Sequence, residues 1–236
     1  MRATLVALAL ALAVPANAAQ VRVPFVGCPA DGQGGPVAPP RTCSAPLVDR
    51  SVARRLAYYC TGSPDEQGVL APRGWHCIML YGSNGESLVV TPAARTFDEL
   101  VSHGVGTGPA VQWTGSIGST SGRSTVDRVI ARLFRQHMAW VRNNVAEGLD
   151  SAPMPNGPYR SDRLARRGPN AVDFTTPGGR HGSGTESFLS AGPDPIRGFH
   201  RLLPNEDMEL TSLFVRLPSA QSGLASTIIE AARRGH

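Results

Sequence analysis

Apolar side chains recur at helical spacing over one long stretch of the chain, from about Ser124 to Glu147. They lie three or four residues apart, at Val126, Val129, Ile130, Leu133, Phe134, Met138, Val141 and Val145. Ser124 and Asp127 suit a first turn, because a hydroxyl accepts a backbone N–H there and a carboxylate fits the positive helix end. The pattern predicts one long amphipathic helix near 124–147.

Shorter apolar runs predict strands. The runs Trp75–Tyr81 and Ser87–Thr91 flank the tetrapeptide Gly82-Ser83-Asn84-Gly85. An Asn-Gly pair in so short a connection predicts a β-hairpin near 75–91. Further runs that predict strands are Ala110–Thr114, Ala171–Thr175, Gly198–Leu203 and Leu210–Leu217.

Three more segments have the periodicity of helices: Asp49–Tyr59, Phe97–His103 and Ser222–Arg234. The first is expected because Val52, Leu56 and Tyr59 would share one face. Residues 149–169 contain four prolines and are expected to form a loop. Strands and helices are mixed without a regular βαβ alternation, so we expect an α+β fold with a largely antiparallel sheet and a C-terminal helix.

The first 18 residues have the organisation of a secretory signal. Arg2 precedes the apolar stretch Leu5–Val14, and Ala16-Asn17-Ala18 provides a small-x-small cleavage site after Ala18. We therefore expect a periplasmic or extracellular protein. Residues 19–46 are rich in proline and glycine and are expected to lie extended, whereas 47–236 would form a single α+β domain.

Four cysteines follow the expected signal, at positions 28, 43, 60 and 77. An even number in an exported chain predicts two disulfides, with three possible connectivities. No metal site is expected, since no C-x2-C or H-x3-H spacing is present. Loop entropy mildly favours the sequential pairs, but geometry can overturn a difference of about 1 kcal/mol.

Composition excludes several kinds of chemistry. All 23 basic residues are arginine, so there is no lysine for a Schiff base, a lysine general base or a Gly-Lys phosphate loop. The formal net charge is +5 and aromatic residues make up 6% of the chain, which does not favour a nucleic-acid partner for an exported protein. No apolar run after the N-terminus is long enough for a transmembrane helix.

Three motifs are distinctive: Gly27–Gln33 (GCPADGQ), Leu70–Cys77 (LAPRGWHC) and Tyr81–Gly85 (YGSNG). In these motifs the chain resembles a family of uncharacterised secreted bacterial proteins, which implies export but no activity. The motifs contain only Cys28 and Cys77, so the resemblance implies a bridge between those two residues. Cys43 and Cys60 would then form a second, inner bridge.

Hydrolase chemistry has weak candidates. A G-x-S-x-G elbow is missing from the sequence, and a penicillin-binding S-x-x-K pattern is impossible without lysine. A scattered triad would draw on the following residues: Ser83 or Ser121 as nucleophile, His76 or His181 as base, and Asp173 as orienting acid. Such a triad would make the protein a secreted esterase or amidase. Ser83 is equally explained as a turn residue, and His76 as a structural or exposed histidine.

Paired carboxylates are the alternative hydrolytic chemistry. Glycoside cleavage needs two acids facing one cleft, and the chain offers Glu86, Asp173, Glu186 and Asp194. No local pattern selects a pair among them.

Gly115–Arg123, which leads into the long predicted helix, is the main candidate for ligand binding. Seven of its nine residues are glycine, serine or threonine. An anion could be bound at the helix start by Ser119, Thr120, Ser121 and Arg123. The structural alternative is a flexible connection whose last serine caps the helix.

Four arginines fall on one face of the same predicted helix: Arg128, Arg132, Arg135 and Arg142. Such a stripe is usually solvated, but it could also meet anionic lipid headgroups or cell-envelope polymers. Our leading hypothesis is therefore a non-catalytic envelope-associated protein that binds an anionic or carbohydrate ligand. No cofactor is expected, and the oligomeric state is open.

Overall fold

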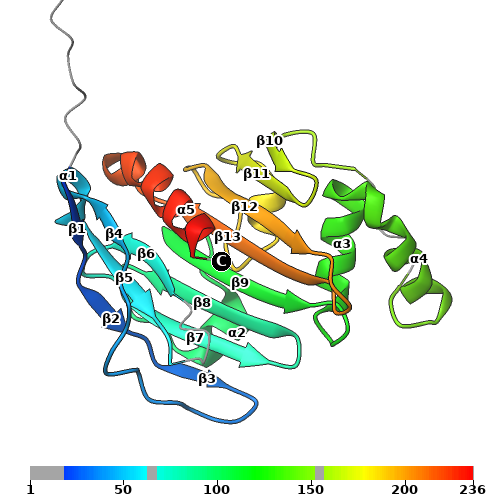
Figure 1. Ribbon diagram of the computed structural model, residues 1–236, viewed down its shortest axis with the longest axis horizontal. Helices are drawn as coiled ribbons and strands as arrows, with labels where there is room; N and C mark the ends of the chain where they lie inside the picture. The colour runs from blue at the N-terminus through cyan, green and yellow to red at the C-terminus, as the bar shows by residue number, and fades with distance from the viewer. Residues whose placement is uncertain (1–18, 63–67, 152–156, 236) are drawn as a thin grey trace, which may run out of the picture.

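The computed structural model describes residues 19–62, 68–151 and 157–235, so the expected signal segment 1–18 lies outside the described residues. An eight-stranded sheet, in the order β10-β11-β12-β13-β9-β8-β7-β3, forms the centre of the fold (Figure 1). Its strands are β3 (Ala30–Gly32), β7 (His76–Gly82), β8 (Gly85–Thr91), β9 (Ala110–Ile117), β10 (Arg163–Gly168), β11 (Ala171–Thr176), β12 (Ile196–Leu203) and β13 (Glu209–Arg216). All neighbours are antiparallel except β3 and β7, which confirms the predicted α+β fold with a largely antiparallel sheet.

The predicted hairpin is formed by β7 and β8. Gly82 pairs with Gly85, and Ser83 and Asn84 make the turn. Gly85 has a φ of +116°, and a Cβ at this position would lie 2.0 Å from the carbonyl oxygen of Gly115. Glycine is therefore required both by the backbone conformation and by the close approach of β9.

Two small sheets use the N-terminal part of the chain. The strands β2 (Phe25–Gly27), β5 (Leu56–Cys60) and β6 (Gly68–Pro72) form a three-stranded sheet, and β1 (Gln20–Arg22) pairs with β4 (Leu47–Asp49). Segment 19–46 thus contributes three short strands. Because β1 pairs across the expected boundary at residue 46, this segment is built into the fold.

Two disulfides tie the N-terminal segment to the rest of the protein. Cys28 is bonded to Cys77 of β7 and Cys43 to Cys60 of β5, with Cα–Cα distances of 5.3 and 6.6 Å. This nested pairing is the one that the family resemblance implied, and it differs from the sequential pairs that loop entropy favours. Disulfides of this kind are typical of an oxidising, extracytoplasmic compartment.

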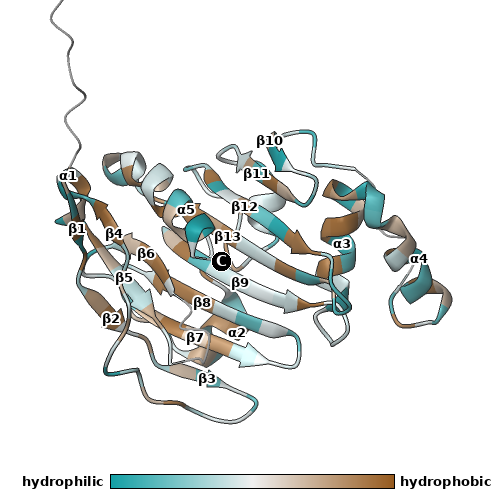
Figure 2. Ribbon diagram, in the orientation of Figure 1, coloured by the Kyte–Doolittle hydropathy of each residue, from teal (hydrophilic) through white to brown (hydrophobic). Residues whose placement is uncertain are grey.

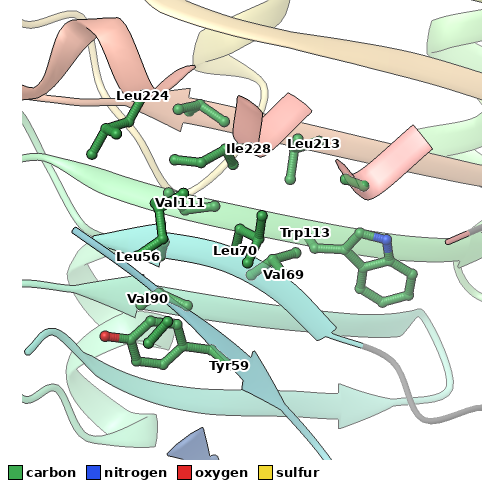
Figure 3. Packing of buried hydrophobic residues seen from close by; sticks show 14 of the residues in the cluster. Leu56, Tyr59, Val69, Leu70, Val90, Val111, Trp113, Leu213, Leu224 and Ile228 are labelled. Atoms are coloured by element: carbon green, nitrogen blue, oxygen red, sulfur yellow. The ribbon is translucent and has the colours of Figure 1, made fainter. Parts of the chain in front are cut away.

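One face of the large sheet packs against the small β5–β6 sheet and against helix α5 (Ala225–Arg234), which follows the 3-10 turn η3 (Ser219–Leu224). Figure 3 shows this core, where Leu56 and Leu70 meet Val111, Leu213 and Ile228. The predicted C-terminal helix is thus confirmed. Among the described residues, no helix has the length and apolarity needed to cross a membrane.

The opposite face carries two separate apolar clusters. Helix α2 (Phe97–His103) covers the first, in which Leu100 packs with Phe174 and Phe214. Helix α3 (Arg123–Leu133) covers the second, in which Ile130 packs with Leu202 and Leu210. The gap between the two clusters is where the candidate site lies.

The single long helix expected over 124–147 is broken. The segment consists of α3, the 3-10 turn η1 (Arg135–His137) and α4 (Met138–Ala146). Phe134, with φ −125° and ψ 57°, ends α3, and its side chain is fully buried. Met138 and Val141, which follow the break, still pack into the same apolar cluster as α3.

The helix expected over 49–59 is also wrong. Only α1 (Arg50–Ala53) is helical, and Leu56–Cys60 is the strand β5. The apolar spacing rested on three residues, whereas Leu-Ala-Tyr-Tyr-Cys is a run of strand-favouring residues that pairs with strands on both sides.

The short N-terminal strands β1 to β4, and also β6 and β10, were not predicted from the sequence. β10, in the predicted loop 149–169, is an exposed, arginine-rich edge strand without alternation, and β6 is short and buried throughout. Figure 2 shows the contrast, with β6 brown and β10 teal.

Candidate functional site

A cavity of about 680 Å³ lies on the α2/α3 face of the large sheet. Its walls include Leu80, Phe188 and Phe214 from the first apolar cluster and Val129 of α3 from the second. Strands β7, β8, β9, β12 and β13 contribute the floor, and residues 181–188 contribute one side. The volume is in the range of sites that hold a small organic molecule.

A row of polar side chains crosses the floor. Register places His200 opposite Ser212, Ser212 opposite Thr114, and Thr114 opposite Ser87, on four adjacent strands. All four line the cavity. Their strand neighbours Phe199, Leu213, Trp113 and Leu88 belong to the core on the other face. The alternation of the strands therefore directs one apolar set to the core and one polar set to the cavity.

His200 and Ser212 are joined within this row. His200 Nδ1 lies 2.8 Å from Ser212 Oγ, and each residue is only 2% exposed. The imidazole stacks on Phe174 with ring centroids 4.9 Å apart and meets the edge of Phe214 at 5.8 Å. Burial lowers the pKa of His200 to about 4, so the imidazole is neutral near pH 7.

This pair is better suited to hydrogen bonding than to nucleophilic catalysis. A histidine that takes a proton from serine must pass through an imidazolium, and burial disfavours that charge at His200. Within the described ranges, no carboxylate hydrogen-bonds to the ring to stabilise it. The second ring nitrogen, Nε2, is likewise without a hydrogen bond to these residues.

Gln112 occupies the next inward-facing position of β9, opposite Phe214 and Val89 on the flanking strands. It is 2% exposed, and its Oε1 accepts a hydrogen bond of 2.9 Å from the backbone N–H of Phe188. This bond ties the floor to the side of the cavity. It also fixes the orientation of the amide, whose NH₂ group is left for other partners.

The side of the cavity contains a charged cluster of three residues. Glu186 forms an ion pair with Arg132 of α3 and accepts a hydrogen bond of 2.5 Å from the hydroxyl of Tyr159. The Arg132 guanidinium lies 4.2 Å from the centroid of the Tyr159 ring. Burial and the contact with Glu186 raise the pKa of Tyr159 to about 12, so the phenol stays protonated. The cluster joins α3 to the two loops that carry Tyr159 and Glu186.

Buried polar contacts hold these loops in place. Asp162 accepts hydrogen bonds from Thr176 Oγ1 at 2.7 Å and from the N–H of Ser183, the first residue of the 3-10 turn η2 (Ser183–Thr185), at 2.8 Å. Arg216, 1% exposed, donates to the carbonyl oxygens of Gly106, Gly108 and Ser190. The segment that carries Phe188 is thereby fixed to the end of the sheet.

The structure does not join the serine, histidine and aspartate candidates into a triad. Ser83 and Ser121 do meet, with 2.8 Å between their Oγ atoms. His76, however, lies at the other end of β7, roughly 20 Å away along the strand. Asp173 is ion-paired with Arg167 and with Arg233 of α5, on the far face of the sheet.

His181 is the one member of that set that lines the cavity. It does so together with Glu86 and Glu186, the two carboxylates that the structure brings to one site. Asp173 and Asp194 do not line it.

The polar groups of the expected anion-binding loop already have internal partners. Ser119 Oγ donates to Asp207 at 2.6 Å and Thr120 Oγ1 to the carbonyl of Ile117 at 2.8 Å, while Ser121 bonds to Ser83. Arg123 donates to the carbonyl oxygens of Leu149 and Ser119. The loop is therefore an ordered connection to α3, whose N-cap is Gly122 and not Ser124. Its binding of an anion stays a prediction, and it would require these contacts to be displaced.

The arginine stripe is not a uniform solvated face. Arg128 lines the cavity, and Arg132 is largely buried in its contact with Glu186 and Tyr159. Arg135 and Arg142 are exposed, on η1 and α4 respectively. The break at Phe134 separates the two pairs.

Sequence reasoning missed five residues that the structure brings to the site: Gln112, Thr114, Tyr159, His200 and Ser212. The available signal was a polar residue inside an apolar strand, as at Gln112 between Val111 and Trp113. Such a residue is directed either to solvent or to a cavity, and only strand register distinguishes the two.

Within the described residues, no group of three histidine, cysteine, aspartate or glutamate side chains is placed to hold a metal ion. Comparison with known proteins gives no match: no family model, no curated protein and no solved structure is similar to the chain.

Proposed function

We propose that the protein binds a small, polyhydroxylated ligand of the carbohydrate class in the cavity, without chemical turnover. The observation that carries this proposal is the floor, where His200, Ser212, Thr114 and Ser87 form a polar row across four strands. Buried polar groups need hydrogen-bond partners, and a ligand with several hydroxyl groups supplies both donors and acceptors at short spacing.

The balance of charge favours a neutral ligand over an anion. Glu86 and Glu186 line the cavity together with Arg128, and Arg132 is engaged by Glu186. The two carboxylates are matched by two guanidinium groups, so these charges provide no excess of positive charge to attract an anion. This supports the carbohydrate part of our hypothesis rather than its anionic part.

The apolar walls are also compatible with a sugar. The rings of Phe97, Phe188 and Tyr159 line the same cavity as the hydroxyl-bearing floor. Sugar rings present C–H faces that pack on aromatic side chains while their hydroxyl edges form hydrogen bonds. A site with a few polar groups among apolar walls is the usual composition of a small-molecule pocket.

The cellular location in this proposal is the periplasm or the extracellular medium. The two disulfides support an oxidising compartment, and the N-terminal sequence supports export through a signal cleaved after Ala18. Cell-envelope saccharides would then be within reach of the cavity.

Calorimetric titration of the disulfide-bonded protein with a panel of neutral and anionic saccharides tests the proposal. Thr114→Val keeps the shape of a floor residue and removes its hydroxyl, so it should weaken binding about tenfold. Thr211→Val on β13 is the matched control, since Thr211 alternates with the inward-facing Ser212. If no neutral saccharide binds, or if both variants weaken binding equally, the cavity is not the site.

The hydrolase alternative has a weaker physical basis, because the serine–histidine pair of the cavity lacks a stabilised imidazolium. An esterase and amidase screen with Ser212→Ala, Ser83→Ala and Ser121→Ala would reveal it. Turnover that is abolished by one of these substitutions would favour hydrolysis over binding.

A further inference from the structure

We infer that the floor of the cavity recognises the acetamido group of an N-acetylated amino sugar, with the side-chain amide of Gln112 as the hydrogen-bond donor. This inference rests on the proposed carbohydrate-binding function and names the substrate class of the same site.

The amide nitrogen of Gln112 is an unused donor. Its partner atom Oε1 is taken by the N–H of Phe188, so the side chain cannot turn round without losing that bond. Nε2 makes no hydrogen bond with the described residues, and this nitrogen remains accessible to solvent. Because Gln112 is 2% exposed and lines the cavity, its NH₂ group faces the cavity interior.

The surroundings of this donor are apolar. Gln112 lies opposite Phe214 on β13 and opposite Val89 on β8, and Leu80 also lines this part of the cavity. A ligand group that fits here must present a carbonyl oxygen to the amide and a small apolar group to the phenyl and aliphatic walls. An acetamido group has both features in one planar unit.

Hydroxyl partners for the sugar ring lie next to this position. Thr114 is two residues further along β9, about 7 Å away, and Ser212 is directly opposite Thr114 at a Cβ separation of about 5 Å. One pyranose ring can therefore reach these hydroxyls while its acetamido substituent contacts Gln112.

A carboxylate would also accept a hydrogen bond from Gln112, but a buried charge needs a counter-charge. His200 is neutral near pH 7, Arg132 is already paired with Glu186, and the positive charge of Arg128 is offset by Glu86 in the same cavity. A neutral acceptor such as an acetamido carbonyl avoids this cost.

Titration calorimetry with N-acetylglucosamine, glucosamine and glucose tests the inference on the disulfide-bonded protein. We expect N-acetylglucosamine to bind about tenfold or more tightly than glucose. In its ionised form Gln112→Glu keeps an oxygen for the N–H of Phe188 and removes the donor, so at a pH where this carboxyl is ionised the preference should fall to less than threefold. Gln20→Glu, at an exposed position of β1, makes the same chemical change away from the cavity and should leave the preference intact.

The outcomes separate the inference from the proposed function. Equal binding of glucose and N-acetylglucosamine would overturn the acetamido inference while the saccharide site stands, and this comparison needs no variant. A preference that survives in folded Gln112→Glu would likewise overturn it. Failure of every sugar to bind would overturn both.

Discussion

Acidification should destabilise the protein through His200. The pKa of this histidine is about 4 in the folded protein, because the side chain is buried, and about 6.5 in the unfolded chain. Since the folded pKa is the lower one, the contribution of neutral His200 is fully present above pH 6.5 and is lost as the pH falls towards 4. A difference of about 2.5 pKa units corresponds to about 3 kcal/mol of unfolding free energy.

Urea unfolding followed at several pH values between 7.5 and 4 measures this effect. His200→Gln removes the titrating group, so its unfolding free energy should change with pH by about 3 kcal/mol less than that of the wild type. His103→Gln is the matched control, because His103 is exposed at the end of α2. It should retain the wild-type pH dependence.

Comparison of the wild type with His200→Gln isolates His200, since these two proteins differ in this titrating group alone, and the control shows the effect of losing an exposed histidine. If His200→Gln loses stability with the same pH dependence as the wild type, His200 does not titrate as a buried neutral imidazole. The interpretation of His200 as a hydrogen-bonding partner of Ser212, and not as a catalytic base, would then fail.

Three further substitutions test the packing around the site. Burial raises the pKa of Asp127, whose oxygens accept hydrogen bonds from Asn144 Nδ2, so the contribution of the protonated carboxyl to the unfolding free energy is lost as the pH rises. Asp127→Asn does not titrate and should be more stable than the wild type at pH 7 and equal to it near pH 3.5. A lower melting temperature of this variant at pH 7 would contradict this prediction. Arg216→Met leaves three carbonyl groups without their donor and should cost about 3 kcal/mol in urea unfolding, whereas a loss below about 1 kcal/mol would show that these contacts do not anchor the loops. Replacing Cys28 and Cys77 together by alanine should cost about 2–4 kcal/mol and expose residues 19–46 to protease before the rest of the chain, and simultaneous cleavage of both regions would refute the proposed anchoring.

Local signals predicted the elements whose geometry is decided locally. The Asn-Gly pair identified the β7–β8 hairpin, and α2 (Phe97–His103) has the predicted bounds because Thr96 and Glu99 form a capping box at its start. The helix expected over 49–59 failed for the opposite reason. Leu56 and Tyr59 fit a helical spacing, but pairing with β2 and β6 determines the conformation of the segment.

The candidate site could not be read from local patterns. Its floor combines Gln112 and Thr114 of β9 with His200 and Ser212 from strands about 90 residues later. Each is a polar residue with an apolar neighbour in its strand, and only the register shows that they face one cavity. The expected binding loop Gly115–Arg123 had the right composition for a site, but the hydroxyls of Ser119, Thr120 and Ser121 fix the connection to α3.

Mapping of ligand-induced amide shifts by ¹H–¹⁵N NMR, with N-acetylglucosamine as the probe, tests the central claim most directly. If the cavity binds the sugar, the largest shifts should fall on Gln112, Thr114, Phe188 and Ser212, which border the cavity floor. Shifts concentrated on the loop Ser119–Arg123, or no shifts at saturating sugar, would contradict the account.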